Sequence, residues 1–332
     1  MSETLYCPGT LAEGYSTYSP TCLRRVFNGK KVSHILPYTV DKENFDDLSL
    51  FINNRKRISI SGVQEKSSLL LEKNQLRLTK EGERGTYILK PIPINVKNPK
   101  LVPANEHLTM QIARQVYGIN AAENAMVFFN NGAPAYITKR FDVRPDGTSF
   151  GKEDFASLSG KSKDTAGDEF KYTGSYEEAA GLIKKYVPAW QIEIEKFFTL
   201  VLFNFAFSNG DAHLKNFSLL ETIDGDYLLS PAYDLLNTRI HVDDSDFALE
   251  KGLFADDYKS EIWKKYKHPG KIDFVEFGKR IGIQEKRIEK LINPYTEKQQ
   301  KVYELTEHSF LDSSTQRAYI LHYETRKNCL NK

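Results

Sequence analysis

The chain has 332 residues, of which 40% are apolar and 12% aromatic, so it is long and apolar enough for a globular protein with two domains or lobes. Lys and Arg outnumber Asp and Glu by only 46 to 44, which excludes the overall basic field that would by itself indicate nucleic-acid binding. The three cysteines lack the paired spacing of a zinc site, and the sequence shows neither a signal pattern nor an apolar run long enough to span a membrane. These features favour a cytoplasmic protein with free thiols.

The N-terminal part of the chain gives the weakest signals. Residues 1–54 scatter Gly, Pro and Ser among short apolar pieces, and we expect them to form an appendage of uncertain structure. The polar segment 55–66 contains a single Gly62 and leads into a predicted β-hairpin over 69–79. Such a loop can present backbone N–H groups to a phosphate, and Lys66 adds a cation. The same pattern also fits an ordinary exposed loop with a basic run.

A lysine at a strand end and a glutamate in a helix then follow one another. The predicted strand 87–90 ends in Lys90, and the predicted helix that opens at Pro103 carries Glu106 in its first turn. A glutamate there ordinarily complements the helix dipole. A strand lysine followed by a helix glutamate is also how the small lobe of a kinase pairs its ATP-orienting lysine. A further hairpin over 125–142 completes an order of sheet, helix and sheet.

Helical patterns dominate after residue 142. Ser175 and Glu178 form a capping-box pattern, and Pro188 opens a long helix. Four more helices are predicted near the C-terminus, at 271–282, 284–292, 294–308 and 312–326. We therefore expect a small lobe at 55–141 and a mostly helical large lobe at 142–332.

The most informative stretch lies at the end of the long helix. An apolar run over 197–207 predicts a buried helix, and directly after it come four side chains that can handle protons, phosphates or metal: Asp211, His213, Lys215 and Asn216. Asp211 and Asn216 are five residues apart, as are the base and the metal-binding amide of protein kinases. A predicted hairpin over 217–230 then leads to Asp234, the second expected metal ligand. A solvated loop at a helix end is the alternative for the short pattern alone.

Six motifs in this order resemble those of the HipA family of toxin kinases. They are Ile-Ser-Gly-Val-Gln-Glu-Lys, Ile-Leu-Lys-Pro, Asn-Glu-His, Lys-Arg-Phe-Asp, Asn-Gly-Asp-Ala-His-Leu-Lys-Asn-Phe-Ser and Ser-Pro-Ala-Tyr-Asp-Leu, and they run from Ile58 to Asp234. The resemblance implies an α+β, two-lobed, protein-kinase-like fold with a β-rich small lobe and a mostly helical large lobe. It also implies a serine/threonine protein kinase that uses ATP and Mg²⁺, acts as the toxin of a type II toxin–antitoxin system, and phosphorylates an aminoacyl-tRNA synthetase to halt translation.

The same resemblance assigns roles to individual residues. Asp211 would be the catalytic base, Asn216 and Asp234 the Mg²⁺ ligands, and Lys90 the phosphate-holding lysine with Glu106 as its partner. The remaining ATP-binding residues would be Gly62, Val63, Gln64, Glu65 and Lys66 in the phosphate loop, Lys139, Arg140 and Phe141 at the adenine hinge, and His213 near the phosphates.

A serine pair precedes the phosphate loop. Ser59 corresponds to the serine that family members autophosphorylate, and with Ser61 it forms a Ser-Ile-Ser sequence that resembles the short, HipT-like subgroup. Each phosphate would add a charge of about −1.5 to −2. Our hypothesis is that this charge draws the loop from the nucleotide towards Arg55–Arg57 and switches the enzyme off. Loop solubility is the alternative explanation for the serines.

The expected partners also follow from the resemblance. An antitoxin with a DNA-binding domain, similar to HipB, would restrain the kinase, and DNA would be contacted only through it. No membrane is expected. From the resemblance we expect the chain to lack most of the small N-terminal subdomain of long family members, which in short relatives is a separate, HipS-like protein. Either a third component supplies that piece, or residues 1–54 replace it.

Two other functions remain open. The acidic stretch Asp243–Asp246 would suit a small-molecule kinase of related fold. A non-catalytic module that holds an antitoxin on DNA is the other alternative. Four intact residues argue against it, because a protein that only binds does not need them all: Lys90, Asp211, Asn216 and Asp234.

Overall fold

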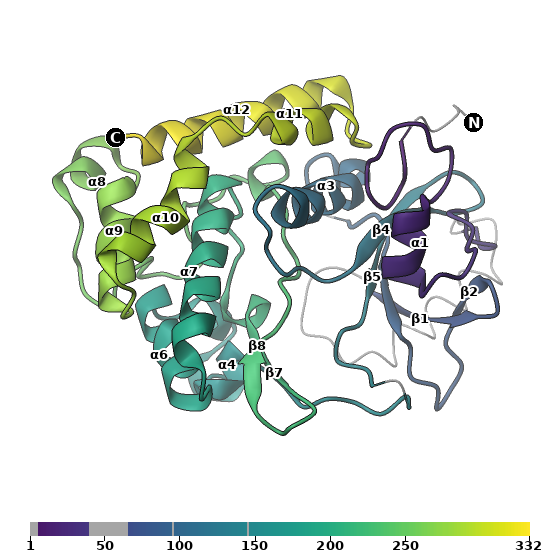
Figure 1. Cartoon of the computed structure of the whole chain (residues 1–332), viewed down its shortest axis with the longest axis horizontal. Coiled ribbons are helices and arrows are strands. Elements are labelled where there is room, and N and C mark those ends of the chain that lie inside the picture. The colour runs from purple at the N-terminus through teal and green to yellow at the C-terminus, as the bar shows by residue number, and fades with distance from the viewer. Residues whose placement is uncertain (1–5, 40–65, 95, 145) are drawn as a thin grey trace.

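The computed structural model describes residues 6–39, 66–94, 96–144 and 146–332. A β-sheet with α1 and α3 forms one lobe, and helices α6 to α12 build most of the other (Figure 1). Each lobe has its own cluster of buried apolar side chains, although α3 contributes to the core of the large lobe. The two-lobed, protein-kinase-like α+β fold is therefore confirmed.

The small lobe contains a five-stranded antiparallel sheet. Its strands lie in the order β2-β1-β3-β5-β4, and they are β1 Ser67–Glu72, β2 Gln75–Leu78, β3 Tyr87–Lys90, β4 Asn124–Phe128 and β5 Pro134–Lys139. Both predicted hairpins form. The pairing of β3 with β5 sets Leu89 opposite Ile137 and Lys90 opposite Tyr136. Leu89 and Ile137 are fully buried in the small-lobe core, so register and burial agree on which residues face inward.

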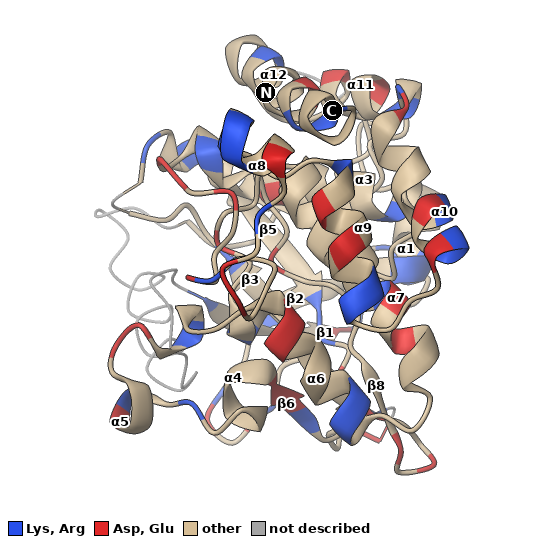
Figure 2. Ribbon diagram, turned by 90° about the vertical axis from the view of Figure 1, so that its left-hand side faces the viewer, with Lys and Arg blue, Asp and Glu red and all other residues tan. Residues whose placement is uncertain are grey.

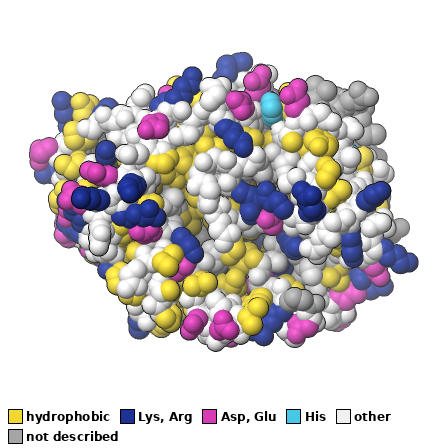
Figure 3. All heavy atoms as spheres, in the orientation of Figure 1, with side chains coloured by type: hydrophobic (Ala, Val, Ile, Leu, Met, Phe, Trp, Pro, Cys, Tyr) yellow, Lys and Arg dark blue, Asp and Glu magenta, His cyan; other side chains and the backbone are white. Residues whose placement is uncertain are grey.

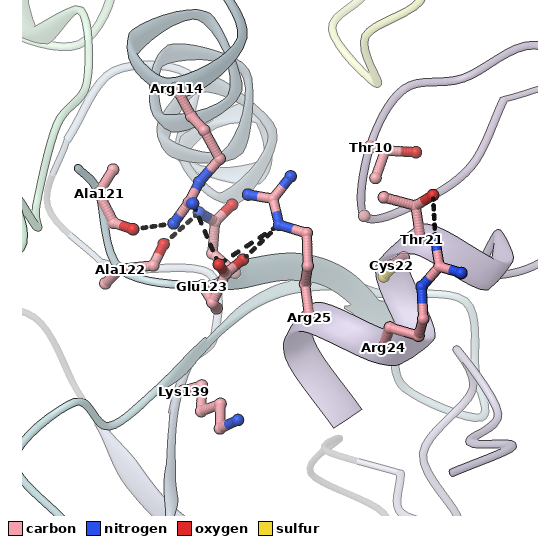
Figure 4. A network of polar contacts seen from close by, with 12 residues as sticks. Thr10, Thr21, Cys22, Arg24, Arg25, Arg114, Ala121, Ala122, Glu123 and Lys139 are labelled. Carbon is pink, nitrogen blue, oxygen red and sulfur yellow. Dashed lines mark hydrogen bonds and ion pairs between the residues drawn. The ribbon is translucent and has the colours of Figure 1, made fainter. Parts of the chain in front are cut away.

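The described part of the N-terminal segment packs on this sheet. Helix α1 (Pro20–Phe27) is capped by Ser19, whose hydroxyl accepts from the Cys22 backbone N–H at 3.2 Å. Arg25 on α1 pairs with Glu123 at 3.0 Å, and Arg114 on α3 pairs with the same carboxylate at 3.1 Å (Figure 4). Glu123 thus joins α1, α3 and the start of β4 at one point.

Helix α3 (Val102–Gln115) is buried on almost every side. It follows a short 3-10 turn at Pro99–Leu101, and it packs against β4, β5 and helix α11. Helices α11 and α12 run along one side of the molecule from the large lobe to α3 (Figure 1). The Thr109 hydroxyl of α3 lies 2.8 Å from the Tyr319 hydroxyl of α12, so the last helix bonds directly to the small lobe.

The large lobe is organised around α7 (Trp190–Ala206), the predicted buried helix. The other elements are β6 Lys152–Asp154, α4 Phe155–Leu158, α5 Lys163–Ala166, η2 Phe170–Tyr172, α6 Tyr176–Tyr186, η3 Leu214–Asn216, β7 Ser218–Glu221, β8 Tyr227–Leu229, η4 Thr238–Ile240, α8 Glu261–Tyr266, α9 Lys271–Arg280, α10 Glu285–Thr296, α11 Gln300–Glu307 and α12 Ser313–Leu330. The capping box at the start of α6 is confirmed: the Ser175 hydroxyl accepts from the Glu178 N–H at 3.1 Å, and the Glu178 carboxylate accepts from the Ser175 N–H at 2.8 Å.

One predicted helix boundary was wrong. The sequence suggested that a new helix starts at residue 294, but α10 continues through Pro294 and ends at Thr296. Pro294 lies in the last turn of α10, where its missing N–H removes a single helical hydrogen bond. The break comes later, and α11 begins at Gln300.

Charged residues of both signs are interspersed over the surface, as seen on α9 and α10 in Figure 2 and over the face in Figure 3. Within the described ranges, no helix combines the length and the apolar character that a bilayer crossing requires.

Candidate active site

Lys90, Glu106 and Asp234 meet between the lobes. Lys90 ends β3 and is 3% exposed, and its Nζ lies 2.6 Å from Glu106 Oε1 on α3 and 2.5 Å from Asp234 Oδ1 after β8. The three side chains come from a strand, a helix and a loop that are far apart in sequence. One ammonium group therefore connects the small lobe to the large lobe.

The charges of this cluster support one another. Burial by itself lowers the pKa of Lys90, but the negative charges of Asp234 and Glu106 outweigh it and hold that pKa above its ordinary value. Burial likewise favours a protonated Asp234, but Lys90 and Lys66 hold the pKa of Asp234 well below its usual range. Burial raises the pKa of Glu106. Lys90 and Asp234 are thus a charged pair at neutral pH.

Asp234 has an unusual backbone conformation and is held by two asparagine side chains. Asp234 has a φ of 56°, in the left-handed region that few side chains other than Asn and Asp adopt. The Asn216 Nδ2 group lies 3.4 Å from Asp234 Oδ2, and the Asn209 side chain reaches the Asp234 carbonyl at 3.5 Å. Just upstream, the Ala122 N–H donates to the Ala232 carbonyl at 2.8 Å, which fixes the approach to Asp234 against the small lobe.

A tight turn carries the chain from α7 to Asp211. A Cβ on Gly210 would lie 2.5 Å from the Cβ of Asp244 and 2.7 Å from the Ser245 carbonyl, so only glycine fits. The chain then folds back through η3. The His213 N–H bonds to the Asp211 carbonyl at 2.8 Å and lies 3.2 Å from the Asn216 side-chain oxygen. This turn explains why two groups five residues apart face the same site.

Asp211 stands at the open side of the site. Its carboxyl is accessible to solvent but crowded by protein atoms, and this partial desolvation raises its pKa. The Tyr172 hydroxyl lies 2.8 Å from Asp211 Oδ1 and opposes that shift. The Tyr172 and His213 rings meet in a T-shaped arrangement, with centroids 5.2 Å apart.

His213 is buried and uncharged. Its side chain is 8% exposed, and burial lowers its pKa to about 4. Within the described ranges, its Nδ1 has no hydrogen-bond partner. The imidazole is therefore neutral at physiological pH.

The remaining predicted nucleotide contacts divide into described and undescribed ones. Lys66 Nζ lies 4.0 Å from Asp234 Oδ2, and the Phe141 ring lies 5.8 Å from the Tyr233 ring, directly beside Asp234. The backbone N–H groups of Lys139 and Arg140 already donate to the carbonyls of Glu123 and Thr86. The Lys139 ammonium donates to the side chain of Asn28, directly after α1, at 2.6 Å. Six predicted residues lie outside the described ranges: Ser59, Ser61, Gly62, Val63, Gln64 and Glu65.

The donor set near Asp234 suits a hard cation such as Mg²⁺. In the described ranges, no group of three or more His, Cys, Asp and Glu side chains could hold a metal by itself. Mg²⁺ does not need such a cage, because it usually takes one or two protein carboxylates together with phosphate oxygens and water. The Asp234 carboxylate and the Asn216 side-chain amide offer oxygens of this kind. Asn216 Oδ1 accepts from the His213 N–H and keeps a second lone pair, so the chemistry of these residues fits.

Several site residues had no sequence signal. Tyr172 lies far upstream of Asp211 in sequence, and no spacing rule links the two. Tyr233 donates to the Lys215 carbonyl at 2.8 Å and so supports the turn before β7. A separate cavity of about 350 Å³, lined by residues of the α3 end, α7 and α10, contains none of the predicted site residues.

Comparison with solved structures identifies a kinase-like fold. Two solved structures share the fold: HipA of Shewanella oneidensis, from a complex with HipB and operator DNA (TM-score 0.59, 19% identity, 82% of this chain and 63% of that one), and the proinflammatory kinase CtkA of Helicobacter pylori (TM-score 0.52, 15% identity, 80% and 93%). The fold and the lysine–glutamate–aspartate arrangement thus define a chain of the two-lobed, kinase-like class.

The family follows from the sequence match. Residues 58–303 match the HipA-like C-terminal domain, and the chain belongs to this family. A Haemophilus influenzae relative named "Putative kinase" is 25% identical over 96% of this chain and 94% of its own length. Two Sinorhizobium fredii relatives named "Putative kinase Y4dM" and "Putative kinase Y4mE" are 31% and 27% identical, and this chain spans 48% and 60% of their lengths.

Proposed function

We propose that this protein is a serine/threonine protein kinase that transfers the γ-phosphoryl group of ATP to a protein hydroxyl. The observation that carries the proposal is Lys90, which lies within 2.6 Å of both Glu106 and Asp234. A lysine held by a helix glutamate beside a metal-binding aspartate is the arrangement that orients ATP in protein kinases.

Each residue has a task in the transfer. Lys90 keeps its charge and pairs with the nucleotide phosphates, and Glu106 fixes its position. Asp211 takes the proton of the acceptor hydroxyl as the new oxygen–phosphorus bond forms. Asn216 and Asp234 would hold Mg²⁺, which would neutralise charge on the phosphates. His213 is neutral, so it adds hydrogen-bonding capacity near the phosphates without adding charge.

The family resemblance supports the finer parts of this proposal, which are the phosphate-binding loop, autophosphorylation, the antitoxin and the acceptor. Lys66 points its ammonium group at Asp234, as expected for the end of a phosphate-binding loop. Autophosphorylation at Ser59 or Ser61 would switch this loop away from the nucleotide. The HipA neighbour was solved with HipB and operator DNA, which supports an antitoxin as the partner of this chain. An aminoacyl-tRNA synthetase is the acceptor that the family suggests.

The small-molecule alternative depends on the acidic stretch 243–246. Asp246 accepts an ion pair from the buried Arg326 at 2.5 Å and lies 2.8 Å from His268, so part of the stretch holds the fold together. Asp244 abuts Gly210, directly before Asp211, and within the described ranges its Oδ2 lacks a hydrogen-bond partner. That oxygen is buried, so the exposed Asp243 is the carboxylate of this stretch that remains for a cationic small acceptor.

The decisive experiment compares the wild type with Asp211→Asn. Both proteins are incubated with Mg²⁺ and γ-labelled ATP, alone and with a cell lysate, and labelled sites are mapped by mass spectrometry. We expect label on a loop serine and on a lysate protein, reduced by at least about a hundredfold in the variant. Label on small molecules alone would establish the alternative. Absence of any label, from unphosphorylated protein that binds ATP, would leave a binding module.

A further inference from the structure

The Tyr172 hydroxyl occupies a site next to the reacting group. Its oxygen lies 2.8 Å from Asp211 Oδ1, and because an ionised carboxylate only accepts hydrogen bonds, the phenol is the donor. Within the described ranges, no hydrogen bond to Asp211 Oδ2 is formed. The tyrosine therefore binds one carboxylate oxygen of this exposed aspartate and leaves Oδ2 without a hydrogen bond from the described residues.

Three roles are open to a hydroxyl at this place. It could be a phosphoryl acceptor, it could block the acceptor site, or it could orient the base. The first two require Tyr172 to move, either to the nucleotide or out of the way. The third requires it to stay. How firmly the segment is held therefore distinguishes the roles.

The segment around Tyr172 is firmly held. The Tyr172 N–H donates to the Glu169 carbonyl at 2.9 Å, and the Glu250 N–H donates to the Tyr172 carbonyl at 2.9 Å. Lys161 donates to the Thr173 carbonyl at 2.9 Å. Backbone bonds continue on the same side, from the N–H of residue 251 to the carbonyl of residue 174 at 3.1 Å. Residues 172–174 are thus bonded to residues 250–251 at several points.

The ring of Tyr172 is fixed as well. It packs against the His213 ring at an interplanar angle of 73°, and His213 is itself buried in the turn that carries Asp211. The preceding Phe170 is buried and anchors the other end of the short 3-10 turn. Ring and backbone together hold the hydroxyl at a set point relative to Asp211.

Other charged groups also face the base. Lys171 lies on the same turn as Tyr172 and favours an ionised Asp211, whereas the charge of Asp234 disfavours it. Asp244 faces Asp211 from the segment after η4. Among these neighbours, Tyr172 makes the largest contribution that lowers the pKa of Asp211 against the effect of burial.

We propose that Tyr172 is a positioning residue that holds Asp211 so that Oδ2 receives the acceptor proton, a role that rests on the proposed kinase function. The acceptor oxygen forms a bond to the γ-phosphorus, and its proton passes to Asp211 Oδ2. The bond from that phosphorus to the bridging oxygen breaks, and ADP leaves with the electron pair. Tyr172 keeps its own proton throughout and touches neither the nucleotide nor the acceptor.

The test is Tyr172→Phe in the full chain, with Tyr186→Phe as the matched control. Tyr186 lies at the exposed end of α6, so its variant loses a hydroxyl away from the site. Labelling rates are measured with Mg²⁺, γ-labelled ATP and lysate protein as acceptor, over a range of ATP concentrations and of pH. Thermal melting checks the fold of both variants.

We expect Tyr172→Phe to lower kcat about tenfold to a hundredfold, the effect of losing a hydrogen bond to a charged group, while KM for ATP changes less than about twofold. The acid limb of the pH–rate profile moves to higher pH, because the variant removes an interaction that lowers the pKa of Asp211. A purely structural tyrosine would not shift that limb.

Each other result overturns the proposal. A rate and acid limb equal to those of the wild type would show that the hydroxyl does nothing for the base. A faster rate would show that Tyr172 blocks the acceptor, and phosphate on Tyr172 would make it the acceptor. A wild type that labels nothing would remove the kinase function and this role with it. If Tyr172→Phe unfolds at a lower temperature than the wild type, Tyr172 is replaced by 3-fluorotyrosine, whose hydroxyl is a stronger hydrogen-bond donor. The proposal then requires the acid limb of the pH–rate profile to move to lower pH.

Discussion

Asn105 and Asn237 hold each other by two reciprocal hydrogen bonds. The Asn105 side-chain amide donates to the Asn237 carbonyl at 2.8 Å, and the Asn237 N–H donates to the Asn105 side-chain oxygen at 3.0 Å. Both residues are fully buried. Asn105 directly precedes Glu106, and Asn237 follows Asp234 by three residues. The pair therefore fixes the positions of the two partners of Lys90 relative to one another.

Replacing Asn105 by Ala should therefore weaken both the fold and the site. The change leaves the N–H and carbonyl of Asn237 buried without these partners, which costs about 1–3 kcal/mol per group. We expect a lower unfolding free energy in urea and weaker ATP binding by calorimetry. Asn293→Ala, at an exposed position on α10, is the control. Normal ATP affinity in Asn105→Ala would show that the relative positions of Glu106 and Asp234 do not depend on this pair.

The charge cluster predicts different outcomes for one and two substitutions. Lys90→Met removes the cation from Glu106, which is 2% exposed, and an unpaired buried charge costs about 3–5 kcal/mol. Lys90→Met with Glu106→Gln should recover part of that stability but no activity, since the phosphates still lack their lysine. Chemical denaturation and the labelling assay measure the two effects separately. Recovery of activity in the double variant would exclude Lys90 as a phosphate ligand.

A pH effect on stability should come from His107. It is fully buried on α3, its Nε2 lies 3.3 Å from the Gly9 carbonyl, and burial lowers its pKa from 6.5 to about 4. The unfolded chain binds a proton at about pH 6.5 and the folded chain does not. The contribution of neutral His107 is complete above pH 6.5 and falls by about 3 kcal/mol as the pH drops to 4.

The measurement compares the unfolding free energy of wild type and His107→Gln across this pH range. The difference between the two should shrink as the solution becomes acidic, because only the wild type must keep this histidine neutral. A difference that stays constant from pH 7 to pH 4 would contradict a depressed pKa for His107.

Replacing each of two glycines by Ala should have opposite effects. Gly210→Ala introduces a methyl group 2.5 Å from the Cβ of Asp244, so the turn must shift and Asp211 with it. We expect at least about a tenfold loss of kcat. Gly181→Ala on α6 meets nothing within 4 Å and should raise stability by about 0.5–1 kcal/mol without changing the rate. Equal rates for both variants would show that the turn tolerates the displacement.

The sequence anticipated the parts of the site that have local signals. Lys90 ends a strand, Glu106 lies in the next helix, and a hairpin returns to Asp234, so pattern and order were enough to place them in one cluster. The prediction that Glu106 lies in the first turn was wrong, because α3 begins at Val102 and Glu106 is its fifth residue. Tyr172 was not anticipated, because its hydroxyl meets Asp211 through the packing of two distant turns. The pairing of Asn105 with Asn237 was missed for the same reason. Local periodicity specifies elements, but it carries no information about which side chains meet between them.

The N-terminal segment shows the same limit. Its helix α1 has a normal cap at Ser19, yet the short apolar pieces around it gave no clear period. The helix is stabilised by burial against the sheet and by Arg25 on Glu123, which are tertiary contacts. The wrong boundary at Pro294 has a different origin, since a proline in the last turn of a helix resembles one in the first turn of the next.

The C-terminal helix α12 makes the site depend on residues that never approach it. Tyr319 bonds to Thr109 beside the lysine–glutamate pair, His322 lies 3.1 Å from Asn237, and Arg326 reaches both Asp246 and Ser208. Helix α12 thus contacts the small lobe, the segment after Asp234 and the turn before Asp211 at successive points along its length. A partner that binds the outer face of α12 and tilts this helix would displace all three regions together, and would so change the site without contacting it.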